Sequence, residues 1–164
     1  MAFDAFLKIN GVPGESSDDL HKEWIEVLSY SLGVDQPKTA SASSHGSLSA
    51  ERANFHDFHV VKALDKASPK LFVACASGQH FPDATLEICR AGGDKQPFME
   101  YKLTDVIVTS LRPGGTGKGE SVPLEEVSLS YGKIEWKYTQ TKVAGGKGSG
   151  NVAGGWDLKT NKKI

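Results

Sequence analysis

The fold is decided by the stretch EVSLSYGKIEWKYT, residues 126–139. Apolar and polar residues alternate through this stretch on both sides of one glycine. The apolar positions are Val127, Leu129, Tyr131, Ile134, Trp136 and Tyr138. Because successive side chains of a strand point to opposite faces, this period predicts strands with one buried face. Glycine weakens a strand, so we expect two strands here with a break at Gly132.

The same alternation recurs through most of the chain. It predicts further strands at residues 3–9, 24–32, 54–63, 84–88, 98–111 and 156–159. One short helix is expected, with Ser68 as N-cap, Pro69 at the first helical position and Gly78 at the stop. About eight strands and one helix indicate a mainly β (α+β) fold, a β-barrel formed by two sheets with the helix packed at its side.

Length and charge exclude several classes of protein. The 164 residues fit a single domain, residues 1–164, and the net charge is −1. Lys and Glu alternate along the chain, which argues against nucleic-acid binding because phosphate contacts need clustered cations. No window approaches about 18 apolar residues, so we expect no membrane insertion. The N-terminus lacks the features of a signal peptide, and residues 159–163 are expected to form a solvated lysine-rich tail.

The sequence contains no catalytic or ligand-binding motif with the required spacing. Glycine-rich residues 114–119 lack the spacing of a phosphate-binding loop and precede a strand instead of a helix. His56 and His59 are three positions apart, so on a strand they face opposite ways and do not share an ion. The adjacent Glu125 and Glu126 also point apart. We therefore expect no catalytic residue, no metal and no cofactor, and a chain that is not an enzyme.

Two other features of the sequence bear on partners and compartment. Residues 35–50 contain almost nothing to bury, and a long loop of this kind in a compact domain is usually functional or disordered. We therefore expect this segment to meet a partner. Cys75 and Cys89 are too few for a secreted disulfide scaffold. Two buried unpaired thiols are favoured, and a disulfide between them is the alternative.

Seven short stretches stand in a characteristic order. They are FLKI (6–9), GES (14–16), IEVLSYSLG (25–33), DKASPKL (65–71), ACASG (74–78), RAGG (90–93) and GWDL (155–158). No one of them is specific, but the ordered set resembles the haemolysin-coregulated protein (Hcp) family, the tube subunits of type VI secretion systems. The resemblance covers the whole chain.

This resemblance implies an assembly as well as a fold. It implies a barrel of two sheets with one helix at the side, and sixfold rings that stack into a tube around a wide channel. A contractile sheath surrounds the tube, a spike protein caps it, and effectors ride in the channel. The subunit is made in the cytoplasm and exported through the machine itself to the extracellular space or a target cell.

The resemblance also assigns candidate residues to two surfaces. An extended loop takes part in ring stacking, a role that carries over to Thr39, His45 and Leu48. The channel-lining strand matches residues 24–33 and places Ser31 toward the channel, where its hydroxyl offers hydrogen bonds to cargo. The alternative is that Ser31 only packs in the barrel. A ring that mainly carries effectors, and a hydrolase with a triad drawn from distant loops, are the alternatives to a structural tube.

Overall fold

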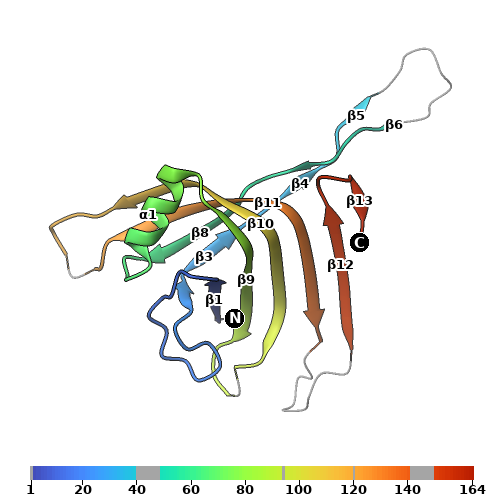
Figure 1. Cartoon of the computed structure of the whole chain (residues 1–164). Coiled ribbons are helices and arrows are strands. Elements are labelled where there is room, and N and C mark those ends of the chain that lie inside the picture. The colour runs from blue at the N-terminus through green and yellow to red at the C-terminus, as the bar shows by residue number, and fades with distance from the viewer. Residues whose placement is uncertain (1, 40–48, 94, 120, 141–149) are drawn as a thin grey trace.

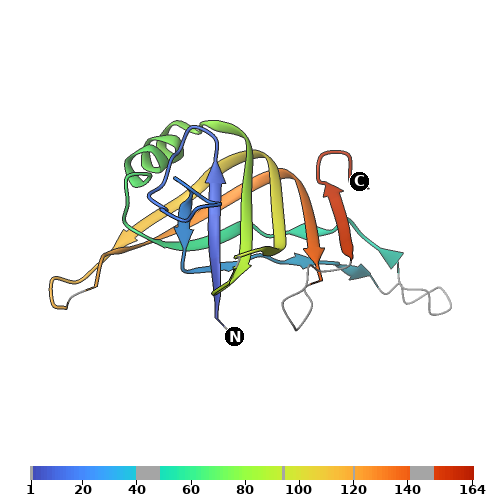
Figure 2. The same ribbon diagram turned by 90° about the horizontal axis from the view of Figure 1, so that it is seen from below.

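One antiparallel sheet of nine strands forms the body of the protein, and its long strands curl together around one core (Figure 1, Figure 2). The computed structural model describes residues 2–39, 49–93, 95–119, 121–140 and 150–164. Seven strands follow the order β13-β12-β11-β10-β9-β1-β2, and β8 joins β11 to β3. The elements are β1 Phe3–Ile9, β2 Ile25–Val27, β3 Ser29–Ser31, β4 Val34–Asp35, β5 Lys38–Thr39, β6 Ser49–Ala50, β7 Asn54–Phe55, β8 Phe58–Ala63, α1 Ser68–Ser77, β9 His80–Arg90, β10 Pro97–Gly114, β11 Leu124–Thr139, β12 Asn151–Asp157 and β13 Lys162–Lys163.

Strand β11 organises the sheet because it pairs with three other strands. It runs antiparallel to β10 along nearly its whole length, while its residues 124–129 also pair with β8 and its residues 133–139 with β12. The predicted break at Gly132 is wrong, since one strand continues through it. The glycine leaves space beside the strand for a side chain of the C-terminal turn. A Cβ atom at Gly132 would lie 2.9 Å from Cε of Lys159, so a larger residue would displace the end of this lysine side chain.

The predicted strand 24–32 is two strands with different partners. β2 pairs with β1, β3 pairs with β8, and the change falls at Leu28, whose N–H donates to the Val61 carbonyl at 2.7 Å. In the described part of the chain β2 and β3 have no other strand partner, so the ladder does not close into a barrel. What the structure confirms is a mainly β fold with one helix.

The helix α1 packs against β10. Gly78 at the end of the helix, with φ 67°, confirms the predicted stop signal, whereas Pro69 is the second helical residue and not the first. Ser68 is not the N-cap, because Ala67 occupies that position and Ser68 is the first helical residue. Leu71 lies on the inward face of the helix and is fully buried in the core. Among the described residues, no helix combines the length and the apolar character needed to cross a membrane.

A buried ion cluster ties the start of this helix to the sheet. Lys62 Nζ donates to Glu125 Oε2 at 2.7 Å and to Ser68 Oγ at 3.1 Å, and it lies 2.9 Å from Asp65 Oδ1. Lys62 and Glu125 are 0% and 2% exposed. All three donors of the ammonium group are therefore used. The Ser68 hydroxyl also lies 2.8 Å from Glu125 Oε2, so this serine contacts both charged members of the ion cluster. Glu126 is exposed, which confirms that the two adjacent glutamates point apart.

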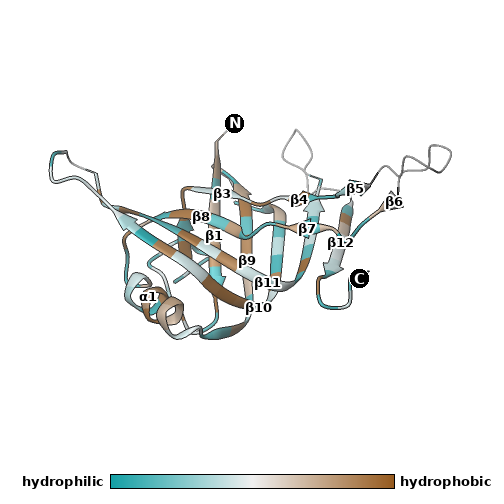
Figure 3. Cartoon of the chain, turned by 90° about the horizontal axis from the view of Figure 1, so that it is seen from above, coloured by the Kyte–Doolittle hydropathy of each residue, from teal (hydrophilic) through white to brown (hydrophobic). Residues whose placement is uncertain are grey.

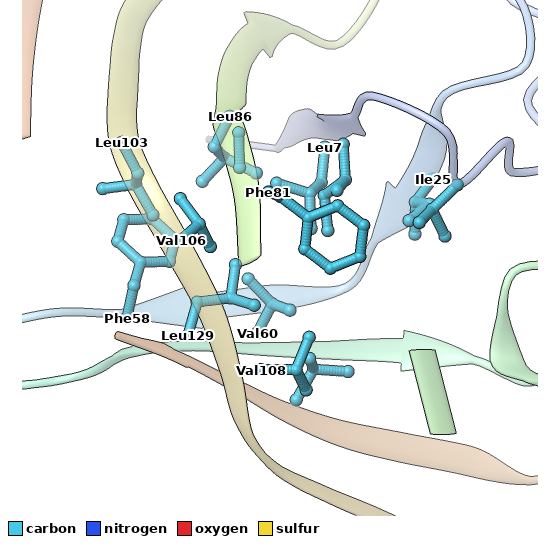
Figure 4. Packing of buried hydrophobic residues seen from close by; sticks show 14 of the residues in the cluster. Leu7, Ile25, Phe58, Val60, Phe81, Leu86, Leu103, Val106, Val108 and Leu129 are labelled. Atoms are coloured by element: carbon cyan, nitrogen blue, oxygen red, sulfur yellow. The ribbon is translucent and has the colours of Figure 1, made fainter. Parts of the chain in front are cut away.

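The inward residues of the curled sheet form one apolar core (Figure 4). Leu103 of β10 and Leu129 of β11 face Phe58 of β8, while Leu86 of β9 and Leu7 of β1 close the opposite side. All five side chains are essentially inaccessible to water. Complete burial of a side chain of this size contributes about 1.5–3 kcal/mol, so the core is the main source of stability.

The C-terminal lysines do not form a free tail. Asp157 Oδ1 accepts the backbone N–H groups of Lys159 at 2.8 Å and Thr160 at 3.0 Å, which turns the chain back. β13 then pairs with β12, and the side chains of its two lysines remain exposed. The backbone hydrogen bond from Thr160 is the main reason why the pKa of Asp157 is lowered.

Candidate functional site

Ser31 lies on the outward face of β3, where it joins a group of polar side chains. In the sheet Ser31 stands opposite His59 of β8, which in turn stands opposite Ser128 of β11. We use the name polar face for Ser31, Asp57, His59, Thr109 and Ser128, which line one shallow groove. Figure 3 shows hydrophilic residues alternating with hydrophobic ones along β8, β10 and β11. Ser31 is exposed and does not pack in the core.

Hydrogen bonds hold the other members of the polar face in place. His59 Nδ1 lies 2.7 Å from Ser128 Oγ. The Thr109 hydroxyl lies 2.8 Å from Asp57 Oδ2 and 3.2 Å from the Ser128 carbonyl oxygen. A catalytic serine–histidine pair needs a third group that orients the imidazole. Asp57 is the carboxylate of the polar face, and the contact that the structure gives it is with Thr109 and not with His59. The arrangement suits binding through donors and acceptors.

The histidines at positions 56 and 59 serve different partners. His56 Nε2 lies 2.6 Å from Asp35 Oδ2, at the point where β4 meets β7. His59 contacts Ser128 on the neighbouring strand β11. The two imidazoles therefore take part in separate contacts. The prediction placed both residues on one strand, but the predicted strand 54–63 is divided and His56 lies between β7 and β8.

Beyond the polar face, the chain segments of β3 and β8 continue into a narrow ribbon. β4 pairs with β7, and β5 pairs with β6, and Figure 1 shows this ribbon leaving the body of the sheet. The predicted loop 35–50 is therefore wrong at its two ends, which are β structure. Thr39 ends β5. His45 and Leu48, the other two stacking candidates, lie outside the described residues.

The base of the ribbon is fixed to the C-terminal part of the sheet. The ring of Phe55 in β7 stacks on Trp156 in β12, with centroids 6.5 Å apart. The Arg52 guanidinium donates to the carbonyl oxygen of Leu158. These contacts join the ribbon to residues far away in sequence, so its direction relative to the sheet is defined by packing.

A second polar cluster lies beneath residues 10–24, which cover the outer face of β1 and β9. His21 is only 1% exposed and stands between two carboxylates. Its Nδ1 is 2.7 Å from Asp18 Oδ2 and its Nε2 is 2.6 Å from Glu87 Oε2. The imidazole also stacks on Phe6, with centroids 4.3 Å apart. The hydrogen bond with His21 is the main reason why the pKa of Asp18 is lowered.

Cys89 completes this second cluster. Its Sγ lies 3.9 Å from His21 Nε2, and the residue is fully buried. Burial above all, and then the charge of Glu87, raise the pKa of Cys89 to about 12. The isolated thiol is therefore protonated and unreactive at neutral pH. Both Cys89 and Cys75, which lies on α1, are free thiols.

This cluster was not predicted from the sequence, because residues 15–23 look like an ordinary polar loop. The available signal was in the strand that the loop covers. Ala5, Phe6 and Leu7 are all buried, so both faces of β1 are covered. An aromatic residue on the supposedly solvated face of a strand indicates a second covering layer, and Phe6 is such a residue.

Comparisons with known proteins agree on one family. The sequence profile of the family described as "Type VI secretion system effector, Hcp" matches residues 6–138. Protein hcp1 of Pseudomonas aeruginosa is 40% identical over 162 residues, which cover 98% of each chain. A solved structure of a type six secretion system protein, 40% identical, superposes with a TM-score of 0.93 over 99% of this chain and 100% of its own. Hcp1 from Salmonella typhimurium is 38% identical, with a TM-score of 0.81 and full coverage of both chains.

Proposed function

Because the chain belongs to the Hcp family of type VI secretion systems, we propose that it is a structural subunit of the secretion tube. Six copies form a ring around a wide channel, and rings stack into a tube that is exported. The observation that carries this proposal is the similarity to hcp1 of Pseudomonas aeruginosa along nearly the whole chain.

An open edge of the sheet supports self-assembly into rings. A ring of identical subunits closes through a heterologous contact, in which two different surfaces of each copy meet. Within the described residues, positions 151–154 of β12 pair with β11 on one side only, and Val152 is 71% exposed. An unpaired strand edge offers backbone donors and acceptors to another chain. We assign one half of the ring contact to this edge.

The ribbon is proposed as the contact between stacked rings, with Thr39, His45 and Leu48 as contributing residues. Its support is the position of β5 and β6, which extend away from the core (Figure 1). Deletion of residues 39–47 should leave folding and rings intact and impair stacking. A deletion within residues 115–119, in the hairpin between β10 and β11, is the matched control and should leave stacking unchanged. Loss of the folded state in the first variant would contradict this role.

The polar face is proposed as part of the channel wall, with Ser31 in contact with effectors. Its groove and its hydrogen-bonding groups favour a second function, in which the ring binds and carries cargo. Replacing Ser31 by tryptophan should retain rings but abolish stabilisation of a bound effector. Ser29 is exposed on the same strand, outside the groove, so Ser29→Trp is the matched control. Equal effector binding by both variants would argue against the assignment.

The remaining parts of the proposal concern the closure of the fold and the partners. We propose that the curled sheet acts as a barrel of two sheets with α1 at its side, closed by the chain itself where Leu28 bonds to Val61. The whole chain, residues 1–164, then forms one domain without enzymatic activity. The contractile sheath, a spike protein and secreted effectors are the proposed partners. The protein is made in the cytoplasm and acts after export.

Direct observation of the assembly tests the main proposal. Light scattering should give a mass of about six times 17.6 kDa. Negative-stain electron microscopy should show an annulus with a central hole. A strict monomer at high protein concentration would refute the tube.

A further inference from the structure

We propose that His21, Glu87 and Cys89 form a binding site for a divalent transition-metal cation, with Zn²⁺ as the expected ion. These residues offer one nitrogen, one oxygen and one sulfur ligand, and the three ligand atoms lie within 4.8 Å of one another. This site is separate from the polar face and from the ribbon. A bound cation would link the loop of residues 10–24 to β9, because His21 belongs to the loop and the other two ligands to the strand.

The distances between the ligand atoms are close to those of a tetrahedral site. Zinc binds histidine nitrogen at about 2.0–2.1 Å and thiolate sulfur at about 2.3 Å, which places nitrogen and sulfur about 3.6 Å apart. The observed separation of His21 Nε2 and Cys89 Sγ is 3.9 Å. His21 Nε2 and Glu87 Oε2 share a hydrogen bond at 2.6 Å, so the carboxylate would move outward by roughly 1 Å when a cation replaces the proton. The side chain of Glu87 is 19% exposed and has room for that movement.

The ring of His21 is already oriented for such a cation. Metal-binding histidines usually donate their second N–H to a carboxylate, which fixes the ring and raises the basicity of the ligand nitrogen. Asp18 Oδ2 occupies that place, 2.7 Å from Nδ1. Stacking on Phe6 fixes the plane of the ring, so Nε2 points toward Glu87 and Cys89.

The surrounding charges favour entry of a cation. A groove beside the cluster is lined by Asp18 and by three more acidic residues, Asp4, Asp19 and Glu26. Among the described residues of its lining, Lys95 is the one basic residue, and it is engaged with Asp18 at 3.1 Å. The carboxylates that oppose ionisation of the buried thiol in the absence of a cation would attract a divalent ion.

The ligand types select the kind of metal. Ca²⁺ and Mg²⁺ are bound by oxygen ligands, whereas one imidazole and one thiolate suit zinc and the neighbouring transition metals. Three protein ligands leave the fourth tetrahedral position for a water molecule. That water would enter from the side of Glu87, which is the solvent-accessible member of the three.

Cobalt provides a direct test, because Co²⁺ replaces Zn²⁺ in such sites and absorbs light when bound to a thiolate. The full-length protein, reduced and treated with a chelator, is titrated with Co²⁺. We expect thiolate-to-cobalt absorption that saturates at one ion per chain, is abolished by Zn²⁺, which binds more tightly than Co²⁺, and is unaffected by Mg²⁺. Absence of this absorption in the wild-type protein would overturn the proposal.

Two cysteine variants locate the site. Cys89→Ser should lose the absorption, and Cys75→Ser, which changes the other free thiol on α1, should keep it. Absorption that depends on Cys75 instead of Cys89 would overturn the assignment. Circular dichroism of each apo variant serves as the control for folding.

A third variant decides the question if Cys89→Ser fails to fold. Glu87→Gln keeps a hydrogen-bond acceptor next to His21 and removes the charged ligand. We expect its affinity for Zn²⁺ to fall by at least tenfold, and Asp18→Asn to weaken binding by about 10–100-fold through loss of the orienting carboxylate. Unchanged affinity in Glu87→Gln would refute the site.

Discussion

Replacing Lys62 by methionine should destabilise the protein more than any surface change. The ammonium group contacts Glu125, Asp65 and Ser68 at 2.7, 2.9 and 3.1 Å. Without it, the Ser68 hydroxyl is the one partner that the described residues leave to the buried Glu125 carboxylate. Removing one member of a buried ion pair costs about 3–5 kcal/mol, because the other charge stays desolvated and uncompensated. Typical domains unfold with about 5–15 kcal/mol, so the loss is a large part of the total.

Urea denaturation followed by circular dichroism measures this loss. Wild-type and variant proteins must be compared at one concentration, because association of native subunits adds to apparent stability. Lys66→Met is the matched control. Lys66 Nζ lies 3.6 Å from Glu23 Oε1, and both side chains are exposed, so that change should cost less than about 1 kcal/mol.

A double variant separates the charge effect from lost packing. Lys62→Met combined with Glu125→Gln removes both charges, and it should be more stable than Lys62→Met alone by about 0.5–3 kcal/mol. If Lys62→Met lies within about 1 kcal/mol of wild type, the reasoning from an uncompensated buried charge is wrong.

Three further predictions concern the loop and the titrating groups. Gly14→Ala should lower the melting temperature, since its Cβ would lie 2.4 Å from a backbone carbonyl oxygen, whereas Gly114→Ala meets nothing within 4 Å and should have little effect. Burial raises the pKa of Tyr101 and of Tyr131 from 10.0 to about 12, so their contribution to stability is complete below pH 10 and should decline between pH 10 and about 12 in urea titrations. The pKa of Asp18 is lowered, chiefly by its hydrogen bond to the buried imidazole, so its stabilisation is present above pH 3.8 and is lost as the pH falls through its folded-state pKa. Asp18→Asn should therefore reduce the acid sensitivity of the unfolding free energy, and an unchanged acid profile would contradict the assignment.

Local periodicity was sufficient to locate most strands but not their partners. The alternation in residues 126–139 correctly indicates β structure, yet it contains no information on which strand lies on either side. The division of the predicted strand 24–32 can be recognised in the local sequence. The inward positions change from odd-numbered residues, Ile25 and Val27, to even-numbered residues, Tyr30 and Leu32, so the alternation shifts by one residue. That phase change is where the chain leaves β1 and joins β8.

Polar residues were harder to predict than apolar ones. Lys62 lies two positions beyond Val60 on the same face of β8, so the strand period places its charge in the core. The polar face was beyond sequence reasoning, since only long-range pairing brings Asp57 and Thr109 together. The family resemblance singled out Ser31, but the side chains that lie next to Ser31 are determined by the strand pairing of the sheet.

The contacts at the base of the ribbon create a dependence between two distant parts of the chain. Arg52 and Leu158 are 106 positions apart, and Phe55 stacks on Trp156 beside them. The orientation of the ribbon therefore depends on the C-terminal strand pair, where the N–H of Ile164 bonds to the Gly155 carbonyl at 3.2 Å. We expect a bulky tag or reporter fused after Ile164 to disturb this strand pair and, through the contacts at the base, the orientation of the ribbon.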